Sequence, residues 1–239
     1  PTMGVFGFFD DASRPDQFVL DVLHAQKTWG EIVVFAEDPA AAKKQLMSRS
    51  ARYSGLLDVL TFEPVADAAE MVKKCGAFLA FGVEPSQVES FLQAAQSAAD
   101  CERMVVSSSG PASTSASYGD LEWTVVSFGD KALVDDVAEG GPIAVDDEDP
   151  VQDGAVSRQD AYRVVAEAFL MSPLTKKAIT LTTGNDYASK YLRTLREQGY
   201  SRRGEIAKIA AGGLKAFQAA EIAAEEAAKP GGKQFDAKD

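Results

Sequence analysis

GVFGFFDDASR, residues 4–14, is the stretch that decides the fold. Apolar residues at 5–9 predict a short buried strand, and the turn after it leads into a helix that begins near Pro15. A tight strand–turn–helix connection of this kind normally carries three glycines, which let the backbone bend sharply and come close to a bound phosphate. Gly7 fits the first of these positions, whereas Asp10 and Ser13 stand at the other two. The scaffold of such a turn is therefore present, but two of its glycines are missing.

Two adjacent carboxylates, Asp10 and Asp11, fall where the first helix would begin. A helix N-terminus carries partial positive charge, and it is a natural site for a phosphate. A carboxylate that already lies there neutralises this charge and repels a second anion. We therefore predict that any grip on a nucleotide phosphate at this turn is weak.

Strand and helix patterns alternate from this stretch onward. Continuous apolar runs, typical of parallel strands covered on both faces, occur at 5–9, 31–36, 56–62, 76–81, 103–107, 121–127 and 178–182. Helical periodicity fills the intervals, at 16–27, 39–52, 66–74, 85–99 and 157–171. Ser157 is the expected N-cap of the last of these helices, with Asp160 as its capping acid. The alternation predicts a doubly wound α/β fold with a parallel sheet of six or seven strands.

Composition restricts the classes of function. The chain has 239 residues and a formal net charge of −12, which argues against binding to nucleic acid or to anionic lipid by the chain as a whole. It contains no run of about 20 apolar residues, the length that crosses a membrane. Cys75 and Cys101 lack the spacing of metal ligands, so we predict two reduced, buried thiols.

Charge is unevenly distributed along the second half of the chain. Residues 130–153 contain nine acids and one Lys, which predicts a solvated surface excursion. The four consecutive acids at 146–149 lack the spaced ligands and the glycine of a calcium loop, so we assign no metal to them. Residues 176–215 contain nine basic residues against three acids. The basic part at 190–203 could contact an acidic partner or fold back onto the chain's own acidic loop, and the sequence does not separate the two.

Four segments carry a resemblance to a known family: FAEDP at 35–39, LEWTVVSFG at 121–129, VSRQDA at 156–161 and KAITLT at 177–182. Through them, and over roughly residues 4–183, the chain resembles the atypical short-chain dehydrogenase/reductase family, in particular its NAD(P)H-binding, NmrA-like members. The resemblance implies a Rossmann-like domain at 1–183 and leaves 184–239 as a helical C-terminal extension. It specifies no reaction.

Several residues that the family uses for its cofactor are replaced. Glu37 stands where members carry a basic residue for the 2′-phosphate of NADP; a carboxylate repels that phosphate, although it can accept a ribose hydroxyl of NAD. Ser127 and Phe128 replace an Arg-Pro pair. Ser107 and Ser108 end the fifth strand, at the edge where such sheets bind ligands; one hypothesis is a catalytic serine there, and a capping and turn role is the stronger alternative. The predicted cofactor contacts, vestigial or weak, are Gly7, Phe8, Asp10, Ser13, Glu37, Ser107 and Ser108.

The catalytic Tyr-x-x-x-Lys pair of the family is also missing. In that pair the Tyr donates a proton and the Lys lowers the pKa of the Tyr. Tyr118 is followed four residues later by Glu122, and Tyr187 precedes Lys190 by three residues rather than four. His24, the single histidine, is distant in sequence from the serines, so no Ser–His hydrolase is indicated. We therefore assign no catalytic residue, no cofactor and no metal, and enzymatic activity is the weaker hypothesis.

A fold that is kept without its active site is usually kept for its surface. Atypical members of the family serve as accessory subunits of energy-converting membrane complexes and as organellar scaffolds. The resemblance thus favours a non-catalytic accessory or scaffold subunit, peripheral to a larger complex. An organellar setting, with a photosynthetic plastid as the leading expectation, agrees with a sequence that begins at Pro1 rather than Met; the cytoplasm is the alternative. The alternative function is an NAD(H)-binding atypical reductase or redox sensor.

The predicted docking segment is Tyr187–Lys229. Its basic residues would help to orient it on an acidic surface. One stripe within it has the spacing by which a helix lies in a groove, formed by Ile206, Ala210, Leu214 and Phe217. The alternative is that this stripe packs on the protein's own sheet.

Overall fold

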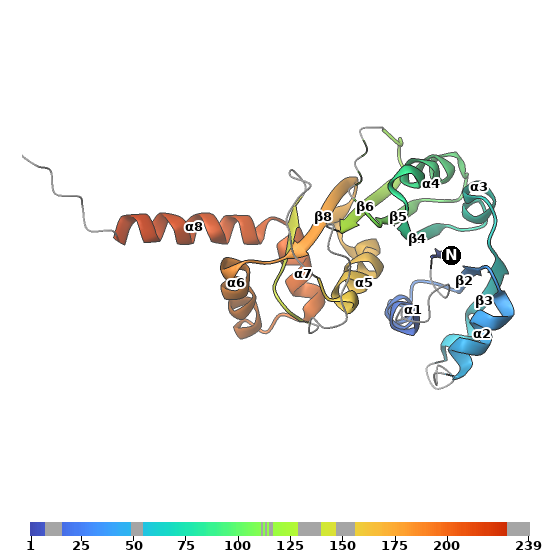
Figure 1. Cartoon of the computed structure of the whole chain (residues 1–239), viewed down its shortest axis with the longest axis horizontal. Helices are drawn as coiled ribbons and strands as arrows, with labels where there is room; N and C mark the ends of the chain where they lie inside the picture. The colour runs from blue at the N-terminus through green and yellow to red at the C-terminus, as the bar shows by residue number, and fades with distance from the viewer. Residues whose placement is uncertain are drawn as a thin grey trace, which may run out of the picture.

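The computed structural model describes residues 1–7, 16–48, 55–110, 112, 114, 117–128, 140–146 and 156–228. They form a sheet with helices on both faces (Figure 1). The strands are β1 (Thr2–Phe6), β2 (Glu31–Ala36), β3 (Leu60–Pro64), β4 (Ala77–Val83), β5 (Arg103–Ser108), β6 (Glu122–Phe128), β7 (Ile143–Asp146) and β8 (Lys177–Thr183). The helices are α1 (Asp16–Ala25), α2 (Pro39–Ser48), α3 (Ala68–Val72), α4 (Pro85–Ser97), α5 (Arg158–Glu167), α6 (Asp186–Glu197), α7 (Arg202–Ala210) and α8 (Gly213–Ala228).

The strand order is β3-β2-β1-β4-β5-β6-β8-β7. The chain moves outward from β1 to β3, returns to β4 beside β1, and then moves outward in the other direction, as doubly wound sheets do. Neighbouring strands are parallel except for β7, which is antiparallel to β8. The predicted fold class is confirmed, with eight strands rather than six or seven.

The edge strand β7 corrects the expectation that residues 130–153 are a solvated excursion. Ile143 is buried and pairs with Thr183, and Val145 pairs with Leu181. The acids on either side of this short apolar segment dominate the composition and conceal its strand pattern. Residues 129–139 and 147–155 lie outside the described part of the chain.

The strand predicted at 56–62 also begins later than expected. Residues Leu56–Asp58 form a turn of 3₁₀ helix after Gly55, whose φ is +68°, and β3 starts at Leu60. Leu56 is buried in the core on the α1 side of the sheet. Leu56, the first residue of the predicted strand, therefore packs in the core from a turn and not from a strand.

Two hydrophobic cores lie on the two faces of the sheet. Along β4, Leu79 and Phe81 belong to the core under α1 and α5, whereas Phe78 and Ala80 belong to the core under α3 and α4. This alternation is the two-residue period of a strand covered on both sides. The crossover from β5 to β6, residues 109–121, has no helix among its described residues.

A buried ionic network fixes α7 to the start of α5. Arg202 donates hydrogen bonds to Asp160 Oδ1 from Nε at 2.9 Å and from Nη2 at 2.7 Å. Arg202 Nη1 also lies 3.0 Å from Glu205 Oε2. The other oxygen of Asp160 accepts from the Ser157 hydroxyl and the Gly140 N–H, at 2.9 and 3.0 Å. Both oxygens of this buried carboxylate therefore have partners, which offsets the cost of burying the charge. Ser157 is confirmed as the N-cap of α5.

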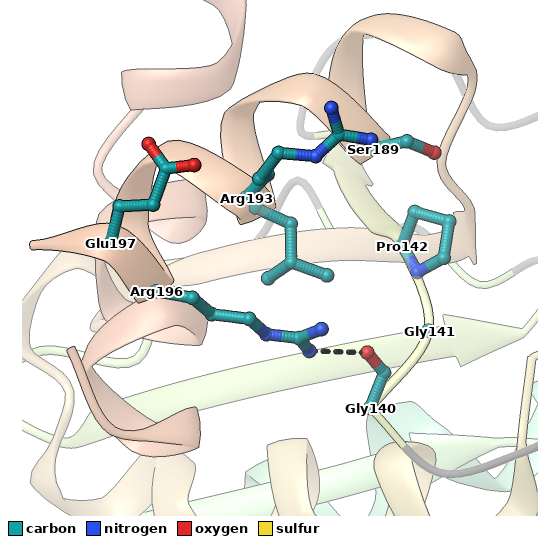
Figure 2. A pocket seen from close by; sticks show the side chains of 8 residues that line it. Gly140, Gly141, Pro142, Ser189, Arg193, Arg196 and Glu197 are labelled. Carbon is teal, nitrogen blue, oxygen red and sulfur yellow. Dashed lines mark hydrogen bonds between the residues drawn. The ribbon is translucent and has the colours of Figure 1, made fainter. Parts of the chain in front are cut away.

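The same network extends to α6 and to the segment before β7. Arg196 donates from Nε to Glu205 Oε1 at 2.9 Å and from Nη2 to the Gly140 carbonyl at 2.5 Å (Figure 2). Arg202 Nη2 donates to the Gly141 carbonyl at 2.9 Å. Two arginines thus hold α6, α7 and this segment together.

The apolar stripe of the C-terminal helices faces inward. Ile206, Ala210 and Leu214 are buried in the same core as Ile179 of β8. The expectation that this stripe is available to a partner's groove is wrong for these three residues, and the alternative, packing on the protein itself, is correct. The basic residues around the stripe are typical of a solvent-exposed segment, and for that reason the sequence did not reveal that the stripe packs in the core.

Helix α8 projects away from the body (Figure 1). Phe217 packs on Tyr191 of α6, with 5.2 Å between ring centroids, and Leu214 is the buried residue of the helix. Farther along, Lys190 pairs with Glu221 at 3.2 Å and the Tyr187 hydroxyl donates to Glu225 at 3.3 Å.

Arg202→Ala should lower the free energy of unfolding by about 3–5 kcal/mol, because it leaves two buried carboxylates without this cation. Urea unfolding followed by circular dichroism measures the change. Lys73→Ala is the matched control, since it removes an exposed pair with Glu70 and should leave stability nearly unchanged. Equal stability of the two variants would contradict the role given to Arg202.

Candidate functional site

The candidate site is the carboxyl edge of the sheet, where the ends of β1 and β4 lie side by side. Doubly wound sheets bind their ligands in the crevice at this reversal point. The described residues at the strand ends include Gly7, Glu37, Gly82, Val83, Ser107, Ser108 and Phe128. Three predicted cofactor contacts in the turn after β1 lie outside the described residues: Phe8, Asp10 and Ser13.

Gly7 occupies a position that only glycine fits. Its φ is +89°, and a Cβ there would lie 2.0 Å from the Phe81 carbonyl oxygen. The end of β1 therefore comes unusually close to β4. Gly7 holds the position of the first glycine in a phosphate-binding turn.

The serines of the edge are buried, and each accepts a hydrogen bond from backbone. Ser107 Oγ accepts from the Gly82 N–H at 3.2 Å, and Ser127 Oγ accepts from the Ala112 N–H at 3.0 Å. Ser108 Oγ accepts from the N–H two residues later at 3.4 Å. These contacts agree with the turn-capping alternative, because Ser108 and Ser127 hold the segment after β5, while Ser107 holds the backbone of β4.

Glu37 is exposed at the end of β2. Its neighbour Asp38 accepts from the Ala41 N–H at 2.9 Å and so caps the start of α2. An acid at the end of the second strand is placed to accept a ribose hydroxyl in dinucleotide-binding folds. Glu37 thus lies exposed at the strand end where such folds carry that acid.

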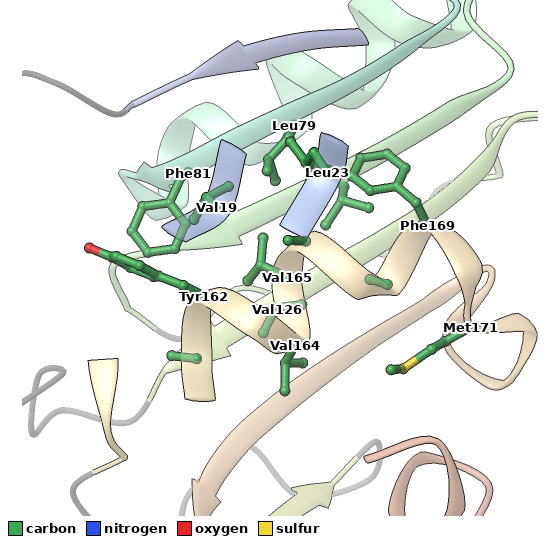
Figure 3. Close-up of a cluster of buried hydrophobic side chains, with 14 of the residues drawn as sticks. Val19, Leu23, Leu79, Phe81, Val126, Tyr162, Val164, Val165, Phe169 and Met171 are labelled. Atoms are coloured by element: carbon green, nitrogen blue, oxygen red, sulfur yellow. The ribbon is translucent and has the colours of Figure 1, made fainter. Parts of the chain in front are cut away.

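Three aromatic residues at this edge were not predicted as part of the site. Phe81 packs edge-on against Tyr162 of α5 with 4.5 Å between ring centroids (Figure 3). The ring centroids of Phe81 and Phe128 are 6.2 Å apart. All three are buried. They fill the α5 side of the edge with apolar surface. Phe81 ends the apolar run predicted at 76–81, and Phe128 directly follows the run predicted at 121–127. A search for polar catalytic groups overlooks both.

The tyrosines of the two incomplete catalytic pairs are engaged elsewhere. Tyr118 precedes β6 at the amino end of the sheet, and its hydroxyl donates to Glu89 of α4 at 2.5 Å. Burial, together with the hydrogen bond to Glu89, raises the pKa of Tyr118. A catalytic tyrosine needs the opposite shift. Tyr187 contacts Glu225 of α8, beside the Lys190–Glu221 pair.

The two thiols are free and buried, as the sequence predicted. Burial raises the pKa of Cys75 to about 12 and that of Cys101 to about 11. Neither is therefore a thiolate at neutral pH. Within the described ranges, no group of three or more His, Cys, Asp or Glu side chains could hold a metal ion. Among the helices that the structure describes, none has the length and apolarity to cross a membrane.

The strand order and the helices on both faces define a Rossmann-like α/β fold, and solved structures of this fold match the chain. The chain is similar to the oxidoreductase ylbE from Lactococcus lactis, with 15% identity, a TM-score of 0.52 and coverage of 84% of this chain and 99% of the other. It is also similar to a Rossmann-fold NAD(P)-binding family protein from Shigella flexneri, with 14% identity, a TM-score of 0.52 and coverage of 77% of this chain and 96% of the other. A third similar structure is that of Gre2 from Candida albicans, solved in complex with NADPH. It has 12% identity, a TM-score of 0.50 and coverage of 88% of each chain.

No protein-family model matches the chain, and comparison with curated proteins gives no match. At these identities, the similar structures confirm the predicted fold and leave the activity of this chain open.

Gly7→Ala should lower the free energy of unfolding by more than about 2 kcal/mol, because a Cβ meets backbone and the positive φ is strained. Gly30→Ala is the control, since nothing lies within 4 Å of a Cβ at that position. Thermal unfolding of both variants measures the difference. A Gly7 variant as stable as the Gly30 variant would show that β1 does not approach β4 in this way.

Proposed function

We propose that this chain is a non-catalytic, Rossmann-like accessory subunit of a larger protein assembly. One observation carries the proposal: the tyrosine and lysine side chains that could replace the missing Tyr-Lys pair are engaged in contacts within the protein. Tyr118 binds Glu89 at the amino end of the sheet, and Lys190 binds Glu221 on α8. At the carboxyl edge Ser107, Ser108 and Ser127 are likewise buried, and their hydroxyls accept from backbone N–H groups.

The C-terminal region supplies surface for a partner. In α8 the side chains beyond Phe217 are exposed or half-buried, and the large apolar residue Ile222 is 38% exposed. Because Ile206 and Ala210 are buried, the predicted docking segment narrows to the outer faces of α6 and α8. An organellar, photosynthetic plastid setting at the periphery of a membrane complex belongs to the same proposal and rests on the family resemblance alone.

Removal of residues 219–239 should keep the fold and abolish partner association. Leu214 and Phe217 remain in this variant, and the pairs that it loses are exposed ones that contribute little. Cross-linking in a native extract, followed by size analysis, measures association, and the melting temperature reports folding. A full-length chain that migrates as a monomer after cross-linking would count against the proposal.

The second candidate is an NAD(H)-binding reductase or redox sensor, and the geometry of Gly7 and the exposure of Glu37 favour it. Calorimetric titration with NADH and NADPH separates the two functions. We expect no binding in the low micromolar range. Such binding, if weakened by Glu37→Ala and stronger for NADH than for NADPH, would support the second candidate, because a carboxylate favours a ribose hydroxyl over a phosphate.

A further inference from the structure

A pocket of about 550 Å³ lies between α6 and the segment that leads into β7 (Figure 2). Its volume is within the range of about 300–1,000 Å³ that is usual for ligand sites. Pro142 and Leu192 supply apolar lining, and Arg193 and Arg196 supply guanidinium groups. The pocket therefore offers cationic donors beside an apolar surface.

Arg196 is held in place before any ligand arrives. Its Nε donates to Glu205 and its Nη2 to the Gly140 carbonyl, at 2.9 and 2.5 Å, while half of the side chain stays exposed. Glu205 is buried, so this anchor is firm. A guanidinium fixed in this way loses little conformational entropy when it binds an anion.

Arg193, one turn earlier on α6, is exposed and has no hydrogen-bond or ion-pair partner within the described residues. In Figure 2 its guanidinium lies toward Ser189, while Arg196 reaches Gly140. The carboxylate of the lining, Glu197, points away from both guanidinium groups. Two cations thus border the pocket, and Arg193 has its donors available.

We propose that this pocket receives an Asp or Glu side chain from an extended, acidic segment of a partner protein, an inference that rests on the proposed accessory function. A guanidinium matches a carboxylate with two parallel hydrogen bonds. Pro142 and Leu192 would contact an apolar side chain next to the acid. Because the chain carries a net charge of −12, an acidic partner is attracted at a local cationic site and repelled elsewhere, which fixes its orientation.

Fluorescence anisotropy with two labelled peptides tests the pocket, one of sequence Glu-Leu-Glu-Leu-Glu and one in which each Glu is Gln. At 0.15 M salt, where charges more than about 8 Å apart are screened, the Glu peptide should bind about tenfold more tightly. Arg193→Gln should remove that preference. Lys208→Gln is the matched control, an exposed cation on α7 outside the pocket, and it should keep the preference.

Equal binding of the two peptides, or equal losses in the two variants, would overturn the assignment. A variant with Asp147→Asn, Glu148→Gln and Asp149→Asn tests a second way in which the assignment can fail. If this variant binds the Glu peptide more than tenfold more tightly, the chain's own acids occupy the pocket and the assignment to a partner is overturned. The peptide assay uses the isolated chain, and cross-linking tests the assembly. Failure of the pocket is therefore distinguishable from failure of the accessory function.

Discussion

A buried carboxylate is costly unless it is paired, and Asp160, buried at the start of α5, is paired with Arg202 of α7. This requirement ties together elements that are distant in sequence. Arg202 also contacts the Gly141 carbonyl ahead of β7, and through Glu205 it is joined to Arg196 on α6. The C-terminal helices are therefore part of the same packed unit as the sheet, although the doubly wound pattern is complete before they begin.

Polar residues at the carboxyl edge have been committed to structure. Ser107 accepts from the backbone of β4 and Ser127 from the backbone of the β5–β6 crossover, and the aromatic group of Phe81, Phe128 and Tyr162 fills the α5 side. Within the described residues of this edge, these side chains stabilise the fold. The charged and accessible groups are found instead on α6 and at the end of β2.

The sheet was predictable because long apolar runs separated by helical periods leave few alternatives. Shorter elements were not. The four residues of β7 are surrounded by acids, and Leu56 is a turn residue whose burial depends on contacts that no local pattern shows. The sequence could not show whether the apolar stripe from Ile206 to Leu214 faces the core or a partner, because both arrangements have the same helical periodicity. In the structure the stripe faces the core, and the Asp160–Arg202 pair holds α7 in that orientation. At the edge, Gly7 and Glu37 could be found from known motifs, whereas the aromatic residues acquire meaning only when the strands and α5 meet.

The crossover from β5 to β6 runs without a helix in its described residues, so Arg103 and Glu122 meet across a separation of 19 residues. Met3 of β1 must instead find Ala77 of β4. Chain closure costs more entropy over longer separations, and local pairings favour rapid assembly. On this ground we expect β5 to pair with β6 before β1 docks on β4. The crevice at the β1–β4 junction is completed at that late step. A molecule that binds there would therefore stabilise the folded chain and would not promote the early steps of folding.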